Sequence, residues 1–179
     1  MKHFVVGRFK SRAKFLPPEI YTYVRDAIVR GCVEALIMDK KMTKVLLGKR
    51  NIKPWDNWWT FGSRMIAGES PEKAVLRTVK QDLGLKISPR RVDFIDVMSL
   101  AFSLRQELPQ ENGCHDLALF FLLLLDERET TAINLRKTEY QEKKWFNPKD
   151  ITKKAGFHPA TIICLKKAME LNHYGKKNS

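Results

Sequence analysis

Residues 62–85 read GSRMIAGESPEKAVLRTVKQDLGL, and this stretch predicts a loop, a helix and a second loop. Ser70 is placed to cap the helix, because a serine oxygen accepts hydrogen bonds from the free backbone N–H groups of a first turn. Pro71 suits the first helical position, and Gly84 suits the left-handed residue that commonly follows a helix. The pattern therefore predicts a helix from about Pro71 to Leu83.

One face of this predicted helix is polar. Thr78, Gln81 and Asp82 are three and four positions apart, so their side chains share a face. Arg77 follows Glu69 by eight residues and is placed to reach back to that carboxylate with a charge-assisted hydrogen bond. We expect the polar face to line a functional site and the Glu69–Arg77 pair to brace the loop.

The rest of the chain mixes helical and extended patterns. They predict a helix from Glu19 with Gly31 just past its end, strands at 32–38, 45–48, 92–104 and 117–125, and a helix from Pro159 to Gly175. The strand at 117–125 is apolar throughout, which is typical of a central strand buried on both faces. We expect one layered α/β domain over residues 19–179.

Composition and charge limit the class of protein. A chain of 179 residues with 44% hydrophobic residues fits a single globular domain and excludes global disorder. The longest apolar run is about half of what a bilayer-spanning helix needs, which excludes a membrane protein. Three widely spaced cysteines indicate a reducing compartment, and we expect a cytoplasmic protein. The net charge of +13 favours an anionic ligand such as a nucleotide or nucleic acid.

Residues 1–18 form a basic arm without an acidic residue. Arg8, Lys10, Arg12 and Lys14 alternate with other residues, so an extended segment would place four cations on one face. One interpretation is a solvated arm or an edge strand whose charges deter aggregation. A second is a strip that contacts the phosphates of a nucleic acid. An acid-free start is also typical of an organelle presequence, although the helical periodicity here is poor.

The stretch at residues 62–85 resembles a Nudix box, which reads Gly, five residues, Glu, seven residues, Arg-Glu-aliphatic-any-Glu-Glu-any-Gly-aliphatic. The positions that match its spacing are Glu69, Arg77, Val79, Gly84 and Leu85. The positions that depart from it are Ser63 for the first glycine, Thr78 and Gln81 for two glutamates, and Asp82 for the last glutamate. The resemblance covers about residues 19 to 172 and implies a Nudix-like α/β/α sandwich with a mixed β-sheet, in which Glu69, Arg77 and Gly84 are structural.

In the Nudix family the glutamates of this helix hold divalent cations against a pyrophosphate, so the resemblance implies Mg²⁺ or Mn²⁺ as cofactor. Because Thr78 and Gln81 carry no charge, several metal ions held by this helix alone are not expected. A branch similar to GDP-mannose mannosyl hydrolase keeps only the last acid of the box and uses one magnesium ion. By resemblance to that branch, we expect Asp82, Glu34 and Glu139 to hold the metal during hydrolysis of a nucleoside diphosphate linked to another moiety, such as a nucleotide sugar.

The same resemblance assigns residues to the substrate. Arg50 and Arg64 stand where the branch has arginines beside the phosphates, and a guanidinium matches phosphate oxygens in pairs. Arg64 is also a catalytic candidate, and Trp58, in a group with Trp55 and Trp59, is a candidate for stacking on a nucleobase. The alternatives are solvated loop arginines and a tryptophan that packs in the core.

Further catalytic candidates are less usual for the family. Glu139 and Tyr140 stand where the branch has Gln-His, and tyrosine is a poor base near neutral pH because its ordinary pKa is about 10. His115 precedes the apolar strand and is another candidate, although a lone histidine more often satisfies structural hydrogen bonds. Glu34 interrupts an apolar strand, where an unpaired carboxylate is costly to bury. Either a metal binds it, or it lies at an open strand end, or it pairs with Arg25 or Arg30.

A second class of function remains open on the sequence. The altered box and the basic charge also fit a Nudix fold that no longer hydrolyses and instead binds nucleotide, RNA or a protein partner. A homodimer is likewise left open.

Overall fold

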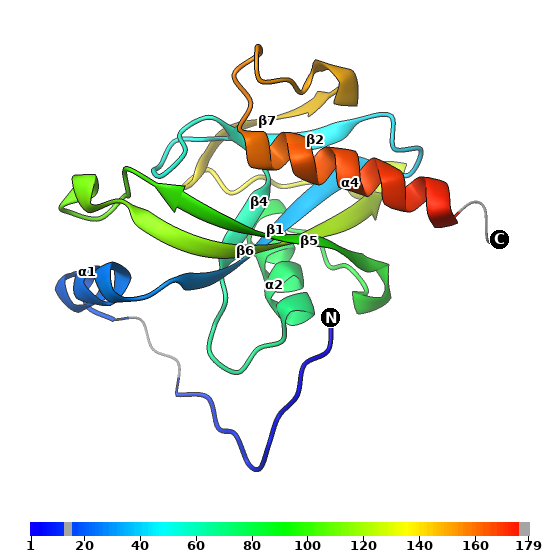
Figure 1. The fold of residues 1–179 in the computed structure, drawn as a ribbon. Helices are drawn as coiled ribbons and strands as arrows, with labels where there is room; N and C mark the ends of the chain where they lie inside the picture. The colour runs from blue at the N-terminus through cyan, green and yellow to red at the C-terminus, as the bar shows by residue number, and fades with distance from the viewer. Residues whose placement is uncertain (13–15, 176–179) are drawn as a thin grey trace.

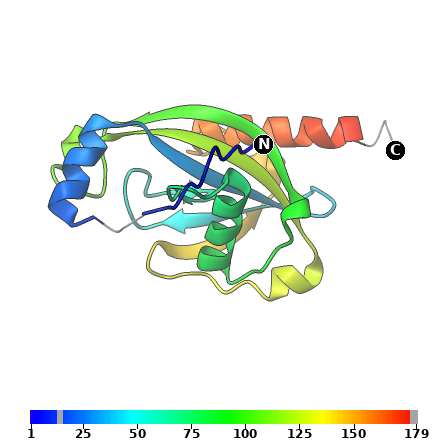
Figure 2. The same ribbon diagram turned by 90° about the horizontal axis from the view of Figure 1, so that it is seen from below.

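A computed structural model describes residues 1–12 and 16–175. A twisted sheet lies between two helices, with α4 (Pro159–Gly175) across one face and α2 (Pro71–Leu83) across the other (Figure 1). The view from below shows α2 in front of the sheet and α4 behind it (Figure 2). The predicted α/β/α sandwich is confirmed.

The described residues form a seven-stranded mixed sheet. Its strands are β1 (Arg30–Asp39), β2 (Val45–Arg50), β3 (Trp58–Trp59), β4 (Phe61–Arg64), β5 (Val92–Phe102), β6 (Cys114–Leu125) and β7 (Tyr140–Phe146). The order is β3-β2-β1-β6-β5, with β4 also paired to β1 and β7 to β2. The central pair β1–β6 is parallel, whereas the other described pairs are antiparallel. The helix α1 (Pro18–Ala27) precedes β1, and the connections between later elements carry α3 (Glu127–Thr131) and single 3-10 turns at Pro89–Arg91, Gln110–Asn112 and Pro148–Asp150.

Local signals set the bounds of α2 as predicted. Ser70 Oγ accepts a hydrogen bond from the backbone N–H of Lys73 at 3.3 Å, and Gly84 follows the helix with φ 73°. The first helix was predicted to reach the residue before Gly31, but α1 ends at Ala27. The difference arises because Gly31 is already part of β1, where it lies opposite Leu117 of the parallel strand.

Two hydrophobic layers pack on opposite faces of β1, because successive side chains in a strand alternate. Cys32, Leu36 and Met38 belong to the layer beneath α4, whereas the odd-numbered residues of β1 belong to the layer beneath α2. Glu34 has the same parity as Cys32 and Leu36, so its carboxylate lies on the α4 side of the sheet. This alternation positions the candidate site described below.

The N-terminal arm lies along the loop that precedes α2. Ser11 Oγ donates a hydrogen bond to the carbonyl of Ala67 at 2.5 Å, and the amino group of Met1 lies 2.6 Å from Glu72 Oε1. Residues 1–12 form no strand, so the edge-strand interpretation is not met over that range; Lys14 falls outside the described residues. None of the described helices is long and apolar enough to cross a membrane.

Candidate functional site

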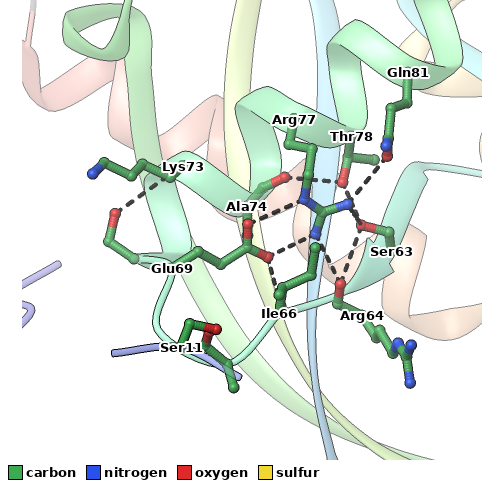
Figure 3. A network of polar contacts seen from close by, with 12 residues as sticks. Ser11, Ser63, Arg64, Ile66, Glu69, Lys73, Ala74, Arg77, Thr78 and Gln81 are labelled. Carbon is green, nitrogen blue, oxygen red and sulfur yellow. Dashed lines mark hydrogen bonds and ion pairs between the residues drawn. The ribbon is translucent and has the colours of Figure 1, made fainter. Parts of the chain in front are cut away.

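The loop before α2 is held by the pair that the spacing of the box predicts. Arg77 Nη2 lies 2.7 Å from Glu69 Oε1, and Arg77 Nε lies 3.1 Å from Glu69 Oε2 (Figure 3). The same guanidinium donates to the carbonyl of Arg64 at 3.0 Å, and Glu69 accepts from the backbone N–H of Ile66 at 2.6 Å. Both side chains are mostly buried, so the brace fixes the loop that carries Arg64.

Two of the three residues on the polar face of α2, Thr78 and Gln81, are uncharged and form hydrogen bonds within the protein. Thr78 is buried, and its hydroxyl lies 2.5 Å from Ser63 Oγ and 3.0 Å from the carbonyl of Ala74. Gln81 Oε1 accepts a hydrogen bond from Arg77 Nη1 at 3.1 Å (Figure 3). These two side chains therefore bring no negative charge to the helix face.

Asp82 is the acid of this face, and it is buried against a tyrosine and an arginine. Tyr140 donates a hydrogen bond to Asp82 Oδ2 at 3.1 Å, and Arg136 Nε lies 3.5 Å from Asp82 Oδ1. Burial raises the pKa of Asp82, opposed by the charge of Arg136 and the bond from Tyr140. Burial also raises the pKa of Tyr140 well above its ordinary value, so its phenol is a neutral donor and not a base.

A pocket of about 260 Å³ adjoins this arrangement, and Glu139, which contacts Arg136, is part of its lining. Several residues predicted for the site line it, namely Glu34, Arg50, Arg64 and Glu139. Further polar and aromatic residues complete its wall, among them Arg25, Arg30, Lys53, Trp55, Trp59, Glu107 and Asp116. Asp82, Tyr140, Trp58 and His115 are not among its lining residues. The pocket thus combines arginines with two buried acids, Glu34 and Asp116.

Of these two acids, Asp116 is paired with Arg30, whereas Glu34, with 8% of its surface exposed, accepts a hydrogen bond from a hydroxyl group. Thr60 Oγ1 donates a hydrogen bond to Glu34 Oε2 at 2.6 Å. Burial raises the pKa of Glu34 to about 7, although the bond from Thr60 and the charge of Arg50 act in the opposite direction. The carboxyl group is therefore poised between its two protonation states near neutral pH.

The alternative in which Glu34 pairs with Arg25 or Arg30 is wrong. Arg30 forms a two-pronged ion pair with Asp116, with both N–O distances at 2.7 Å, and Arg25 contacts Glu107. The interpretation of Glu34 as an open strand end is also wrong, because it is buried in the middle of β1. Its partners are instead the hydroxyl of Thr60 and the nearby charge of Arg50.

The three carboxylates expected to hold a metal are not brought together. Glu34 lies on the α4 side of β1, whereas Asp82 belongs to α2 on the opposite face, and Glu139 contacts Arg136. Over residues 1–12 and 16–175, no three His, Cys, Asp or Glu side chains are grouped so that they could hold a metal ion. The donor set as arranged does not fit Mg²⁺ or Mn²⁺, which need several oxygen ligands around one point.

Two other candidates lie away from the pocket. His115 is exposed, and its Nε2 lies 2.7 Å from Ser99 Oγ; strand alternation turns it away from the pocket, whereas the next residue, Asp116, faces into it. Trp58 packs edge-on against Phe146 with ring centroids 4.8 Å apart. Neither His115 nor Trp58 therefore lines the pocket, where we expected them from the sequence.

The aromatic wall of the pocket comes from the other two tryptophans of the group at residues 55–59. Trp55 and Trp59 line the pocket, and each packs edge-on against His158, at centroid distances of 4.8 and 5.1 Å. Arg64 also lies over the ring of Tyr21, with its guanidinium carbon 4.8 Å from the ring centroid. The group of three tryptophans was the signal in the sequence, but which of them face the pocket depends on the fold.

Comparison with known protein families matches residues 30–165 to the NUDIX domain. The chain belongs to this family. The match runs from β1 into α4 and includes the loop, the helix and the pocket described above, except for the part of the pocket wall that α1 contributes with Tyr21 and Arg25. The stretch at residues 62–85 lies within the matched residues, and its Glu69–Arg77 pair is formed.

Solved Nudix structures share the fold. A MutT NUDIX hydrolase from Burkholderia pseudomallei superimposes with a TM-score of 0.62 and 22% identity, covering 78% of this chain and 98% of that one. An Ap4A hydrolase from C. elegans gives 0.59 and 17%, covering 81% and 98%. The NUDIX domain of Shewanella oneidensis NrtR, solved with ADP ribose, gives 0.59 and 16%, covering 80% and 88%. At these identities the likeness shows the fold, and membership of the Nudix family supports a hydrolase.

One curated relative matches part of the Nudix chain. It is an octanoyltransferase from Myxococcus xanthus, 30% identical over 105 residues, which is 59% of this chain and 27% of that protein. This chain therefore spans about a quarter of the length of that relative.

Proposed function

We propose that this Nudix protein hydrolyses a nucleoside diphosphate linked to a second moiety, and that a nucleotide sugar is the preferred substrate class. The observation that carries the proposal is the pocket in which Arg50 and Arg64 lie with the buried carboxyl group of Glu34. Cations that match phosphate oxygens and an acid with a pKa of about 7 are the groups that this hydrolysis needs.

The arginines serve the diphosphate. The guanidinium groups of Arg50 and Arg64 bind phosphate oxygens in pairs and stabilise the negative charge that develops as the diphosphate leaves. The brace between Glu69 and Arg77 supports this role, because Arg77 also holds the backbone carbonyl of Arg64. Trp55 and Trp59 offer flat aromatic surfaces for a base or a sugar.

Glu34 serves the proton transfer. In its ionised form the carboxylate accepts a proton from the attacking water, whose oxygen forms the new bond while the leaving group departs with the electron pair of the broken bond. A general base works best when its pKa is close to the working pH, and a value of about 7 meets that condition. Thr60 orients the carboxylate through its hydrogen bond to Oε2.

Nudix hydrolases generally use a divalent metal such as Mg²⁺, and the resemblance to GDP-mannose mannosyl hydrolase implies the same for this chain. Because the donor set does not fit such an ion, we assign no step to a metal. The metal dependence of turnover is therefore one of the quantities to measure.

A substrate panel tests the proposal. The full chain is incubated with nucleotide sugars, dinucleoside polyphosphates and ADP-ribose, each with Mg²⁺, with Mn²⁺ and with a chelator, and the products are separated by chromatography. We expect turnover of a nucleotide sugar, about 100-fold lower in Glu34→Gln, because general-base catalysis contributes on that order. The matched control Glu142→Gln changes an exposed acid on β7 and should keep parental turnover. No turnover of any substrate under any of the three conditions would overturn the proposal.

Binding without hydrolysis is the second candidate function. The neutral Thr78 and Gln81 on α2 favour it, because two of the charges that a Nudix helix uses are replaced by internal hydrogen bonds. Calorimetry with the substrates of the panel distinguishes the two functions. A binding module should bind one of them and return it unchanged.

A further inference from the structure

The guanidinium of Arg136 lies between two acids of the predicted metal site. Its Nε is 3.5 Å from Asp82 Oδ1, and its Nη2 forms an ion pair with Glu139 Oε1. One cationic side chain thus contacts the last acid of the Nudix box and the acid that precedes β7. Those are two of the three residues for which the sequence predicts a divalent cation.

Backbone hydrogen bonds fix the segment that carries Arg136. The N–H of Arg136 donates to the carbonyl of Asp82 at 2.8 Å, and the N–H of Asn134 donates to the carbonyl of Leu83 at 2.9 Å. These bonds join the segment before β7 to the C-terminal end of α2. The backbone of Arg136 therefore lies beside that of Asp82, so the side chain of Arg136 is close enough to contact the Asp82 carboxylate.

The charged groups around Asp82 are also balanced by a single cation. The side chain of Asp82 is 4% exposed, and a carboxylate buried to that degree is costly unless it is paired. Arg136 supplies a charge that is permanent, because guanidinium does not lose its proton in proteins. Thr78 and Gln81 add no negative charge that would call for a second cation. A divalent ion at this point would face the repulsion of a guanidinium a few ångströms away.

We propose that Arg136 takes the place of a divalent cation between Asp82 and Glu139, so that this Nudix site is held together by a side chain of the protein itself. The proposal does not depend on the hydrolysis proposed above, because metal binding is measured without substrate. In this arrangement the positive charge beside α2 is a permanent part of the chain. The phosphates of the substrate are bound by the arginines of the pocket.

Mn²⁺ alone is the probe for the test, and its free concentration is followed by electron paramagnetic resonance. Four proteins are titrated, namely the parent, Arg136→Gln, the double variant Asp82→Asn with Arg136→Gln, and the control Arg128→Gln. Arg128 is an exposed arginine of α3, so the control removes the same charge at a distance from the site.

We expect no saturable Mn²⁺ binding by the parent or the control up to millimolar concentrations. Arg136→Gln should bind at least about tenfold more tightly, since it removes a like charge next to the acids, and the double variant should lose this gain. An Arg136→Gln protein that binds Mn²⁺ no better than the parent overturns the proposal.

The parent protein alone provides a second measurement that does not depend on the folding of Arg136→Gln. Its thermal midpoint is recorded with and without Mg²⁺ and Mn²⁺, beside that of Asp82→Asn. We expect the same midpoint under all three conditions, because an ion that binds the folded state would raise it. A rise in the parent that Asp82→Asn abolishes would show that the acids hold a metal despite Arg136, and would overturn the proposal.

Discussion

The hydroxyl of Ser63 lies 2.5 Å from the hydroxyl of Thr78, so that two positions at which the Nudix box has a glycine and a glutamate are joined by a hydrogen bond. The two changes are compatible because each residue gives the other a partner. Thr78 also donates to the carbonyl one turn earlier in α2 and is buried. At Thr78, the polar face of α2 therefore has a structural role in the fold.

Replacing Thr78 should therefore reduce stability more when the new side chain is charged. Thr78→Val removes hydrogen bonds with little change in shape and should cost about 1 kcal/mol of unfolding free energy. Thr78→Glu restores the residue of the box but buries a charge against Ser63, and we expect a cost of about 3 kcal/mol or more. Urea denaturation of the two variants and the parent measures both values. Equal stability of Thr78→Glu and the parent would contradict the buried, bonded position of this side chain.

The pair Glu69–Arg77 should show strong energetic coupling. Its side chains are 15% and 24% exposed and share two hydrogen bonds, so a double-mutant cycle to alanine should give about 1–2 kcal/mol. The exposed pair Lys53–Asp56 is the matched control, with Asp56 58% exposed, and should give less than about 1 kcal/mol. Thermal or urea unfolding of the seven proteins, namely the parent, four single variants and two double variants, measures both couplings, and similar values for the two pairs would count against the brace.

Glu34 should make stability fall as the pH rises. Its pKa is raised from 4.5 to about 7 on folding, so between these values the folded state binds more protons than the unfolded state. Its contribution is fully present below pH 4.5 and is lost as the pH passes through about 7, amounting to at most about 3 kcal/mol at 1.36 kcal/mol per pKa unit.

Glu34→Gln lacks this proton and isolates the effect. The difference in unfolding free energy between the parent and Glu34→Gln, measured from pH 5 to pH 8, should move in favour of the variant as the pH rises. If the difference is constant over that range, the carboxyl group of Glu34 does not titrate there. The same titration would place the acidic limb of the proposed hydrolysis near pH 7.

The basic arm should give any binding of nucleic acid a steep dependence on salt. If Arg8, Lys10, Arg12 and Lys14 contact four phosphates of a single strand, the logarithm of affinity should fall against log salt with a slope of about −3. Replacing the four with serine should flatten the slope and leave the proposed hydrolysis nearly unchanged, because the pocket is built from other elements.

A titration of labelled oligonucleotide at several salt concentrations measures this slope. The matched control replaces four lysines at the other end of the chain, Lys149, Lys153, Lys154 and Lys166, and lowers the net charge by the same amount. An equal effect of the two sets would mean that the total charge matters and the arm does not.

The parts of this molecule that were predictable from its sequence are those fixed by neighbours along the chain. The bounds of α2 follow from Ser70, Pro71 and Gly84, which act within one turn of the helix. The ion pair of Arg30 with Asp116 and the contact of Arg136 with Asp82 join residues distant in sequence, and no local pattern marks them. His115 and Asp116 are adjacent in β6, and the sequence does not tell which of two adjacent strand residues faces the pocket.

The parallel pairing of β1 with β6 has a consequence for the order of folding. Arg30 and Asp116 are 86 residues apart, yet both line the pocket, so its walls meet only after a long segment of chain has been closed. Closing such a segment costs chain entropy before the contacts repay it, and pairings of this kind are slow to form. We therefore expect ligand-binding competence to appear late in refolding, after α2 and the local hairpins have acquired their structure.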